Sequence, residues 1–371
     1  MLDLFGLIYA YHSYPALNEL VIHRTSASLP FCSRYRLIDF AISSMTNAGV
    51  RDVGIVMQKN YQSLLNHLEG GKDWDLDRGN GGLTMMPPYG TNNSDKGQYR
   101  GSMESLSSVR SYIENIRQNH VVLFRGDLAV NLDLVKIYEQ HIASGAEITA
   151  VCTQDAPDSD TIRFLPDEDG KFASKMHLRH SSIAKGLCSI EVYIIDRMRL
   201  LEMIDWCQAN ARIHFHQDAL ARYLRRGGKV GIYIHEGYVS RISSVLSYYK
   251  SNLDMLNFEN RDQLFPDDQP VYTKGRSSVS TYYDENASVT NSLIADGCKI
   301  SGEVENCVIF RGVKIKKGAK LSNCIIMADT IVSEDAELTC VISDKNVFFN
   351  RGVVLMGNSS LPLTVPKNMI V

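Results

Sequence analysis

Short apolar runs alternate with helix-like segments over the N-terminal part of the chain. Four of these runs are apolar and β-branched enough to predict buried strands: Asp52–Met57, His120–Phe124, Ala146–Cys152 and Lys229–His235. Helical patterns lie between them, for example at Asp39–Ala48 and Ser102–Asn115. Strands that alternate with helices predict an α/β domain of the Rossmann-like kind, with a mostly parallel sheet and helices on both faces. Ligands of such sheets bind at the carboxyl ends of the strands.

The C-terminal part carries a short repeat that recurs at nearly constant intervals. Its four copies, spaced by 15, 17 and 16 residues, are Asn291–Ile294, Asn306–Ile309, Asn323–Ile326 and Thr339–Ile342. Small or apolar residues also recur every six positions, as at Ser292, Cys298 and Val304. This step predicts a left-handed parallel β-helix of hexapeptide repeats, with an internal ladder of Ser292, Cys307, Cys324 and Cys340. The alternative, an ordinary β-sandwich, does not predict a step of six.

The two patterns divide the chain into two predicted domains. Residues 1–262 form the α/β domain, and residues 281–371 form the β-helix domain. Between them, residues 263–280 are polar and contain two prolines, which is typical of a linker.

Composition and charge argue against several classes of function. A formal net charge of -3 argues against nucleic-acid and membrane-surface partners, which select for a basic excess. No apolar run reaches the roughly 18 residues that a membrane span needs. The N-terminus lacks a basic region of the signal-peptide kind. The eight cysteines include no Cys-x-x-Cys pair, so we expect reduced thiols and a cytoplasmic location.

The segment Leu29–Phe40 closely resembles the start of the ADP-glucose pyrophosphorylases, or glucose-1-phosphate adenylyltransferases. The resemblance extends along nearly the whole chain. In that family the first strand feeds a triphosphate-binding loop that reads A-G-G-x-G-T-R-L. This chain has Ala10–Leu17 there, with no glycine and with Ala16 in place of the arginine. Glycine lets backbone amides approach phosphate closely, so the resemblance implies a retained fold and a lost triphosphate site.

The other catalytic positions of the family are also changed. Ser26 replaces a lysine, and Arg241 replaces one of the two aspartates that hold Mg²⁺ in the family. The second aspartate is retained as Asp127, which either binds a metal poorly alone or pairs with Arg241. In the sugar-phosphate pocket, Leu178 stands near the family lysine and Glu191 replaces a glycine. The resemblance therefore implies no intact catalytic site, no metal site and no cofactor of the chain's own.

Some residues match family positions that contact ligands. Gly101, Ser102, Asp127 and Asp218 form the set for which weak ligand binding is expected. His214 and His216 share a side if they lie on a strand, but no third metal ligand has suitable spacing.

The resemblance also points to a regulatory role. In bacterial relatives, basic residues near the start of the chain help bind anionic effectors such as sugar phosphates. The matching positions are His23, Arg24, Arg34 and Arg36. Alternatively, Arg34 and Arg36 brace the fold through carboxylates such as Asp39.

The chain is similar to the degenerate, GlgD-type regulatory subunits of the family. This implies a hetero-oligomer, such as a heterotetramer, with a catalytic subunit that binds Mg²⁺ and makes ADP-glucose for glycogen. One alternative is an active sugar-phosphate nucleotidylyltransferase with a divergent site. A hexapeptide-type acyltransferase is disfavoured, because residues 287–371 contain no histidine to act as its base.

Overall fold

The computed structural model describes residues 2–10, 14–79, 81–87, 99–154, 162–178, 186–275 and 277–371. The chain forms two compact units whose segments interleave along the sequence. We call the first the sheet unit; it comprises Met1–His12, Ile38–Arg241 and Asp267–Tyr272. The second, the β-helix unit, comprises Ser13–Leu37, Ile242–Pro266 and Thr273–Val371. The domain boundaries expected from the sequence stay a prediction.

The sheet unit contains the α/β elements. Its strands are β1 (Leu4–Tyr9), β4 (Asp52–Val56), β5 (Gly82–Met86), β6 (His120–Arg125), β7 (Leu128–Ala129), β8 (Ile148–Thr153), β9 (Arg163–Pro166), β10 (Ala173–His177), β11 (Leu187–Asp196), β12 (Val230–Ile234) and β13 (Ser240–Arg241). Its helices and helical turns are α1 (Leu37–Asn47), α2 (Gln62–Leu68), η3 (Glu69–Trp74), α3 (Ser102–Ser108), α4 (Arg110–Asn115), α5 (Leu134–Ser144), α6 (Arg197–Ala209), η4 (Phe215–Leu220) and α7 (Ala221–Arg225). The four strands predicted from apolar runs are thus present as β4, β6, β8 and β12.

These strands build one mixed sheet, with β13 and β7 as a separate antiparallel pair. Strand β1 runs parallel between β4 and β6, and β5 continues the parallel part beyond β4. Strand β11 runs antiparallel to both β6 and β8, while β12 pairs with β8 in parallel. The α/β class is confirmed, and β11 and β10, which run antiparallel to their neighbours, are departures from an all-parallel sheet.

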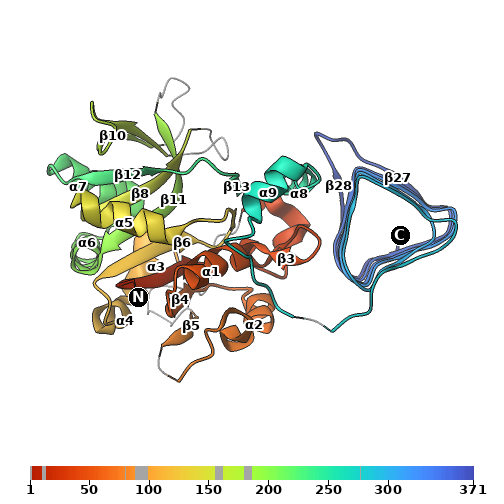
Figure 1. Ribbon diagram of the computed structural model, residues 1–371, viewed down its shortest axis with the longest axis horizontal. Coiled ribbons are helices and arrows are strands. Elements are labelled where there is room, and N and C mark those ends of the chain that lie inside the picture. The colour runs from red at the N-terminus through yellow and green to blue at the C-terminus, as the bar shows by residue number, and fades with distance from the viewer. Residues whose placement is uncertain are drawn as a thin grey trace. The chain divides into compact units, whose positions relative to one another are not determined.

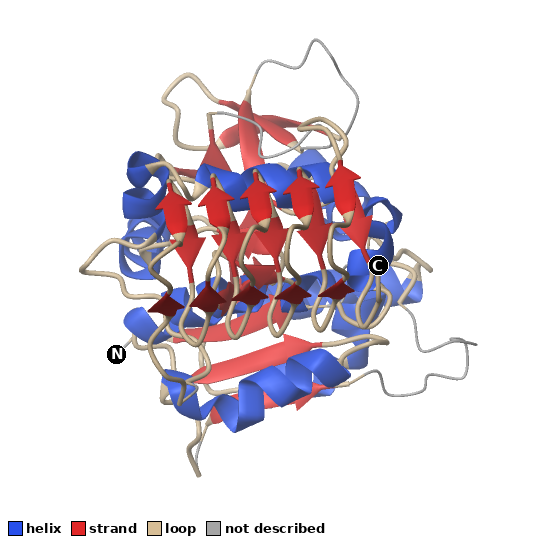
Figure 2. Ribbon diagram, turned by 90° about the vertical axis from the view of Figure 1, so that its right-hand side faces the viewer, coloured by secondary structure: helices blue, strands red, loops and turns tan. Residues whose placement is uncertain are grey.

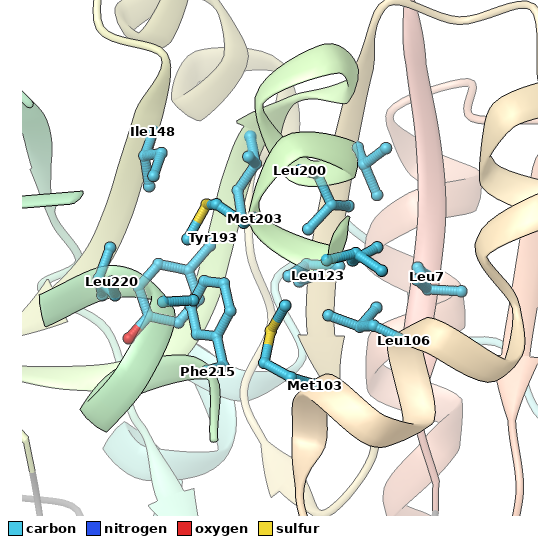
Figure 3. Close-up of a cluster of buried hydrophobic side chains, with 14 of the residues drawn as sticks. Leu7, Met103, Leu106, Leu123, Ile148, Tyr193, Leu200, Met203, Phe215 and Leu220 are labelled. Atoms are coloured by element: carbon cyan, nitrogen blue, oxygen red, sulfur yellow. The ribbon is translucent and has the colours of Figure 1, made fainter. Parts of the chain in front are cut away.

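Helices cover both faces of this sheet, as expected for the class (Figure 1). On one face, the side chains of α3, α6 and η4 pack with Leu7, Leu123 and Tyr193 in a continuous apolar core (Figure 3). On the other face, Gly6 lets α1 approach, because a Cβ there would come within 2.5 Å of the Met45 sulfur. Helix α5 lies on the same sheet, with His141 Nδ1 2.7 Å from Thr149 Oγ1.

The helix predicted over Ser102–Asn115 is broken into α3 and α4 at Val109. Three serine side chains in α3 give a physical reason. Ser105, Ser107 and Ser108 each donate a hydroxyl hydrogen bond to a backbone carbonyl three or four residues earlier. Such bonds compete with the helical ladder and bend or weaken it.

The β-helix unit begins with short elements from two distant parts of the chain. These are η1 (Pro15–Val21), η2 (Ser26–Ser28), β2 (Pro30–Phe31), β3 (Tyr35–Arg36), α8 (Val245–Asp254) and α9 (Phe258–Leu264). The strands of the β-helix follow: β14 (Tyr282–Tyr283), β15 (Ser288–Thr290), β16 (Leu293–Ile294), β17 (Lys299–Ile300), β18 (Glu303–Glu305), β19 (Val308–Ile309), β20 (Lys314–Ile315), β21 (Lys320–Ser322), β22 (Ile325–Ile326), β23 (Ile331–Val332), β24 (Glu337–Thr339), β25 (Val341–Ser343), β26 (Phe348–Phe349), β27 (Val354–Met356) and β28 (Leu363–Val365).

The left-handed parallel β-helix is confirmed. Its strands form three parallel sheets of five strands each, so the chain makes five coils. Viewed along the axis, the three sheets outline a triangle (Figure 1), and from the side the strands of successive coils lie next to one another (Figure 2). The corners need a left-handed backbone, and Asn306 and Asn323 there have φ of 51° and 53°. Asparagine adopts this region more readily than most residues.

The internal ladder was predicted correctly for Ser292, Cys307 and Cys324, and wrongly for Cys340. The strand register pairs Ser322 with Thr339 and Ile325 with Ile342. Cys340 therefore falls opposite Asn323, at a corner with φ of 52°, and Val341 takes the inward place. The coil is one residue longer than the recurring Cys-Val-Ile pattern suggests, which moves the cysteine out of the ladder.

Within this unit, α8 ties the early segment to the β-helix. The Tyr248 hydroxyl donates to Pro30 O at 2.8 Å, and the Tyr249 hydroxyl donates to Asn323 O at 2.7 Å. The Cys32 amide donates to Asn252 Oδ1 at 3.0 Å. Residues that lie more than 200 positions apart in the sequence are thus packed as one body.

Within the described part of the chain, none of the helices combines the length and the apolar character that a bilayer span requires.

Candidate functional site

The site starts at the carboxyl end of β6, where ligands of this fold class are expected. Strand β6 ends in Arg125, and Asp127 follows after one glycine. Arg125 Nε donates to Asp127 Oδ1 at 2.9 Å, and Nη2 donates to Oδ2 at 2.8 Å. The two side chains are only 6% and 1% exposed. Both oxygens of the retained aspartate are therefore engaged by a buried guanidinium two residues away.

A second arginine and a second carboxylate complete the cluster. Strand β13 pairs with β7 and places Arg241 opposite Leu128, the residue after Asp127. Glu191 Oε2 lies 2.9 Å from Arg125 Nη1, and Glu191 Oε1 lies 3.2 Å from Arg241 Nη2. We call Arg125, Asp127, Glu191 and Arg241 the arginine–carboxylate network. Its formal charges, two positive and two negative, cancel.

Glu191 reaches the network from an unusual backbone position. Its φ is 60°, in the left-handed region that favours glycine. The register of β11 against β8 is shifted between Ser189 and Val192, so the residue lies on a bulge. The Glu191 amide donates to Ser189 Oγ at 3.0 Å. A left-handed non-glycine residue costs about 1–2 kcal/mol, which the two ion pairs must offset. The family resemblance puts a glycine at this position.

A chain of polar side chains extends from Glu191 into the core. The Ser189 and Tyr193 hydroxyls lie 2.9 Å apart, and the Tyr193 hydroxyl lies 3.0 Å from His216 Nε2. Burial raises the pKa of Tyr193 well above its ordinary value, and the nearby negative charge of Glu191 raises it further. Tyr193 therefore remains a neutral phenol whose ring packs beside Phe215 (Figure 3).

The chemistry of this set does not suit the divalent cation that the family resemblance would place beside Asp127. Magnesium takes oxygen ligands, whereas a guanidinium offers only N–H donors. Each carboxylate of the network is held by at least one guanidinium, and a dication added beside Arg125 and Arg241 would be repelled by both. Elsewhere among the described residues, His, Cys, Asp and Glu side chains do not gather in threes at metal-binding distances.

Gly101, Ser102 and Asp218 are brought together, and they organise one loop. Asp218 Oδ2 accepts from the amides of Ile213 and His214 at 3.2 and 3.0 Å. Ser102 Oγ accepts from the Phe215 amide at 2.9 Å. A Cβ at Gly101 would lie 2.2 Å from Ile213 O, so only glycine permits this approach. These three residues fasten η4 to the start of α3.

Two of the changed positions, Ala16 and Ser26, lie in the β-helix unit. Ala16 is exposed in η1, and Ser26 is buried in η2. Tyr11, His12 and Ser13, which replace part of the family's loop, fall outside the described residues. Leu178, at the sugar-phosphate position, packs against the apolar core of the sheet unit.

The four residues of the expected anion site have different surroundings. Arg24 is 5% exposed, and its Nη2 lies 2.6 Å from both carboxylate oxygens of Asp344. His23 is exposed, Arg34 is exposed at the tip of the β2–β3 hairpin, and Arg36 is half-buried. The Arg24 guanidinium is thus already occupied by a carboxylate of the chain itself.

Sequence reasoning missed two charged residues, Arg125 and Asp344. Arg125 ends an otherwise apolar strand, and a charge at such a buried position requires a partner, so that signal was available. Asp344 stands 320 positions from Arg24, and no spacing pattern points from one to the other.

Comparison with known proteins finds two family models that match different parts of the chain. Residues 17–163 match the nucleotidyl transferase family model, and residues 277–360 match the GlmU-like C-terminal hexapeptide model. The chain is 31% identical to the glycogen biosynthesis protein GlgD of Bacillus subtilis, across 96% of this chain and 93% of that protein. It is 32% identical to the glucose-1-phosphate adenylyltransferase of Geobacillus stearothermophilus, across 82% and 79%, and 28% identical to that of Bacillus cytotoxicus, across 91% of each. The chain therefore belongs to the family that comprises the glucose-1-phosphate adenylyltransferases and GlgD.

Proposed function

We propose that this chain is a regulatory, non-catalytic subunit of a glucose-1-phosphate adenylyltransferase that serves glycogen biosynthesis. The observation that carries the proposal is the arginine–carboxylate network. Adenylyl transfer needs a cation to stabilise charge on the phosphates, and in this family the resemblance implies Mg²⁺ for that task. Here Asp127 is held by Arg125, and Arg241 stands where the second metal ligand is expected. The chain then needs no cofactor of its own.

The losses in the other unit support the same proposal. Residues 14–17, at the start of η1, include Pro15, which has no amide hydrogen, and Ala16, which has no charge. Ser26 is buried and offers no cation to a triphosphate. An active enzyme would have to replace each of these contacts by new ones.

The proposed partner is a catalytic adenylyltransferase subunit that holds Mg²⁺ and makes ADP-glucose from ATP and glucose 1-phosphate. We propose a hetero-oligomer, of the heterotetramer kind, in the cytoplasm. The chain would act by stabilising one conformation of its partner over another, which is what thermodynamic coupling requires. A sugar-phosphate effector would find the exposed guanidinium of Arg34 and the exposed side chain of His23.

Co-expression with the catalytic subunit of the same organism tests the proposal. We expect the two chains to elute together at the size of a hetero-oligomer. The mixture should form ADP-glucose faster than the catalytic chain alone, or respond differently to sugar phosphates. This chain alone should form none. A lack of complex and of any rate change would remove the support for a regulatory subunit.

A catalytically dead partner separates this proposal from the alternative, an active nucleotidylyltransferase with a divergent site. The partner's metal-binding aspartate is replaced by asparagine, and the complex is assayed again. We expect ADP-glucose formation to be lost, because all turnover comes from the partner. Turnover that persists in this complex would assign the activity to this chain and overturn the proposal.

A further inference from the structure

The network contains a geometry that suits a ligand as well as a side chain. The two oxygens of the Glu191 carboxylate are held by different guanidiniums, Arg125 at 2.9 Å and Arg241 at 3.2 Å. A phosphate group presents pairs of oxygens to arginines in the same way, and guanidiniums are well suited to such bidentate contacts. We propose that Arg125 and Arg241 form an oxyanion site for a phosphate group, and that Glu191 fills this site from within.

The burial of the four residues supports a built site rather than a surface contact. The side chains of Arg125, Asp127 and Arg241 are 6%, 1% and 3% exposed, whereas that of Glu191 is 15% exposed. Glu191 is thus the member of the network that solvent reaches most easily. His216 Nε2 lies 4.0 Å from Glu191 Oε2, and the His216 side chain is likewise partly exposed.

The charges explain why an anion would take the place of Glu191. Asp127 compensates one of the two guanidiniums, so removal of the Glu191 carboxylate leaves a net positive charge in a largely water-excluded site. Such a charge is costly without a partner and binds an anion more strongly than an exposed arginine does. The backbone of Glu191, at a bulge with φ of 60°, is unfavourable by itself. The ion pairs with the two arginines, and not the local backbone preference, therefore hold the carboxylate in the site.

This inference does not rest on the regulatory role proposed above, because it concerns the chain by itself. In the wild-type chain the carboxylate of Glu191 already occupies the place of the ligand, so we expect phosphate compounds to bind there only weakly. Glu191 is thus the residue that decides the ligand preference of the site.

The test uses the full chain with Glu191→Gln, which keeps the side-chain volume and removes the charge. Inorganic phosphate is titrated in by calorimetry, with sodium chloride of matched ionic strength as the reference. We expect the variant to bind phosphate at least about tenfold more tightly than the wild type. Its midpoint of thermal unfolding should rise with phosphate and not with chloride. Addition of Arg241→Gln should abolish the gain.

A matched control is Glu147→Gln in the same unit. Glu147 also binds a guanidinium with both carboxylate oxygens: Oε1 lies 2.7 Å from Arg199 Nη2, and Oε2 lies 3.1 Å from Arg199 Nε. The Glu147 side chain, however, is 43% exposed. It should gain no phosphate affinity. Equal affinity of Glu191→Gln and the wild type would overturn the proposal, as would an equal gain in the control.

If Glu191→Gln is folded in phosphate and unfolded in chloride, that difference supports the proposal directly. If it is unfolded in both, Glu191→Asp decides. The shorter carboxylate retains the charge and cannot bridge both guanidiniums, so phosphate should stabilise this variant more than the wild type. The absence of such a difference would contradict the oxyanion site.

Discussion

The protein buries arginine in two different ways, one in each compact unit. In the β-helix unit, Arg24 meets a single carboxylate, Asp344, with both oxygens 2.6 Å from Nη2. Asp344 Oδ1 also accepts from the Lys345 amide at 2.7 Å. In the sheet unit, two arginines share two carboxylates, and one of these, Glu191, bridges both. The first arrangement is an isolated ion pair and the second is a network.

The difference predicts at which of the two places the loss of one charge lowers the free energy of unfolding more. In the isolated pair, removal of one member leaves the other buried without a compensating charge, so the free energy of unfolding must fall strongly. In the network, Asp127 still compensates one of the two guanidiniums after removal of Glu191, and solvent reaches the place of the lost carboxylate, which is 15% exposed. A change there should alter stability less and alter the ligand that the site accepts.

The largest effect is expected for Asp344→Asn. It should lower the free energy of unfolding by about 3–5 kcal/mol, because Arg24 stays buried and charged. Urea titration followed by circular dichroism measures the loss. Asp335→Asn, which breaks the exposed ion pair with Arg351 on the same β-helix, is the matched control and should change little.

A double variant sharpens this prediction. Arg24→Met together with Asp344→Leu removes both charges and should recover most of the lost stability, since apolar side chains can replace a buried ion pair. A double variant as unstable as Asp344→Asn would show that packing, and not the uncompensated charge, dominates at this place.

An intermediate effect, on the pH dependence of stability, is expected from His141, a buried side chain of helix α5. Burial, together with the neighbouring His120, lowers the pKa of His141 from 6.5 to about 4. Between these values the unfolded chain binds a proton that the folded chain does not. The contribution of His141 to the free energy of unfolding is therefore fully present above pH 6.5. It falls as the pH decreases toward 4, with a slope of at most about 1.4 kcal/mol per pH unit.

Unfolding at several pH values tests this slope. His141→Gln should flatten the dependence, whereas His23→Gln, at an exposed position, should retain the wild-type slope. An unchanged slope in His141→Gln would assign the acid sensitivity to other groups.

The smallest effect concerns the backbone of Glu191. Glu191→Ala and Glu191→Gly both remove the carboxylate, but glycine also relieves the left-handed backbone. The glycine variant should be the more stable of the two by about 1 kcal/mol. At Glu202, in the middle of α6, the order should reverse, because alanine is the better helix former. The same order at both positions would mean that the bulge relaxes when the ion pairs are lost.

The β-helix could be predicted from the sequence because its contacts are periodic. Ser292, Cys307 and Cys324 recur at nearly constant intervals, and each step places the next residue on the one before it. The error at Cys340 has the same origin: the repeated motif was followed where it begins one residue earlier in its coil than in the coil before. The left-handed φ at that corner, and not the letter pattern, decides the register.

The network was only partly predictable. Glu191 and Arg241 were noticed as departures from a family pattern, which says what is lost and not what replaces it. Arg125 was missed because its role depends on residues 66 and 116 positions away. Such pairings follow from the sheet topology, in which β11 lies beside β6 and β13 beside β7.

The pairing of Arg24 with Asp344 has a consequence for synthesis of the chain on the ribosome. The two residues are 320 positions apart, so at about 5–20 residues per second Arg24 emerges roughly 16–64 s before its counter-ion exists. During that interval residues 14–37 have no finished β-helix to pack against. The nascent chain must keep this segment hydrated and free from aggregation, and the β-helix unit can close only when translation is almost complete.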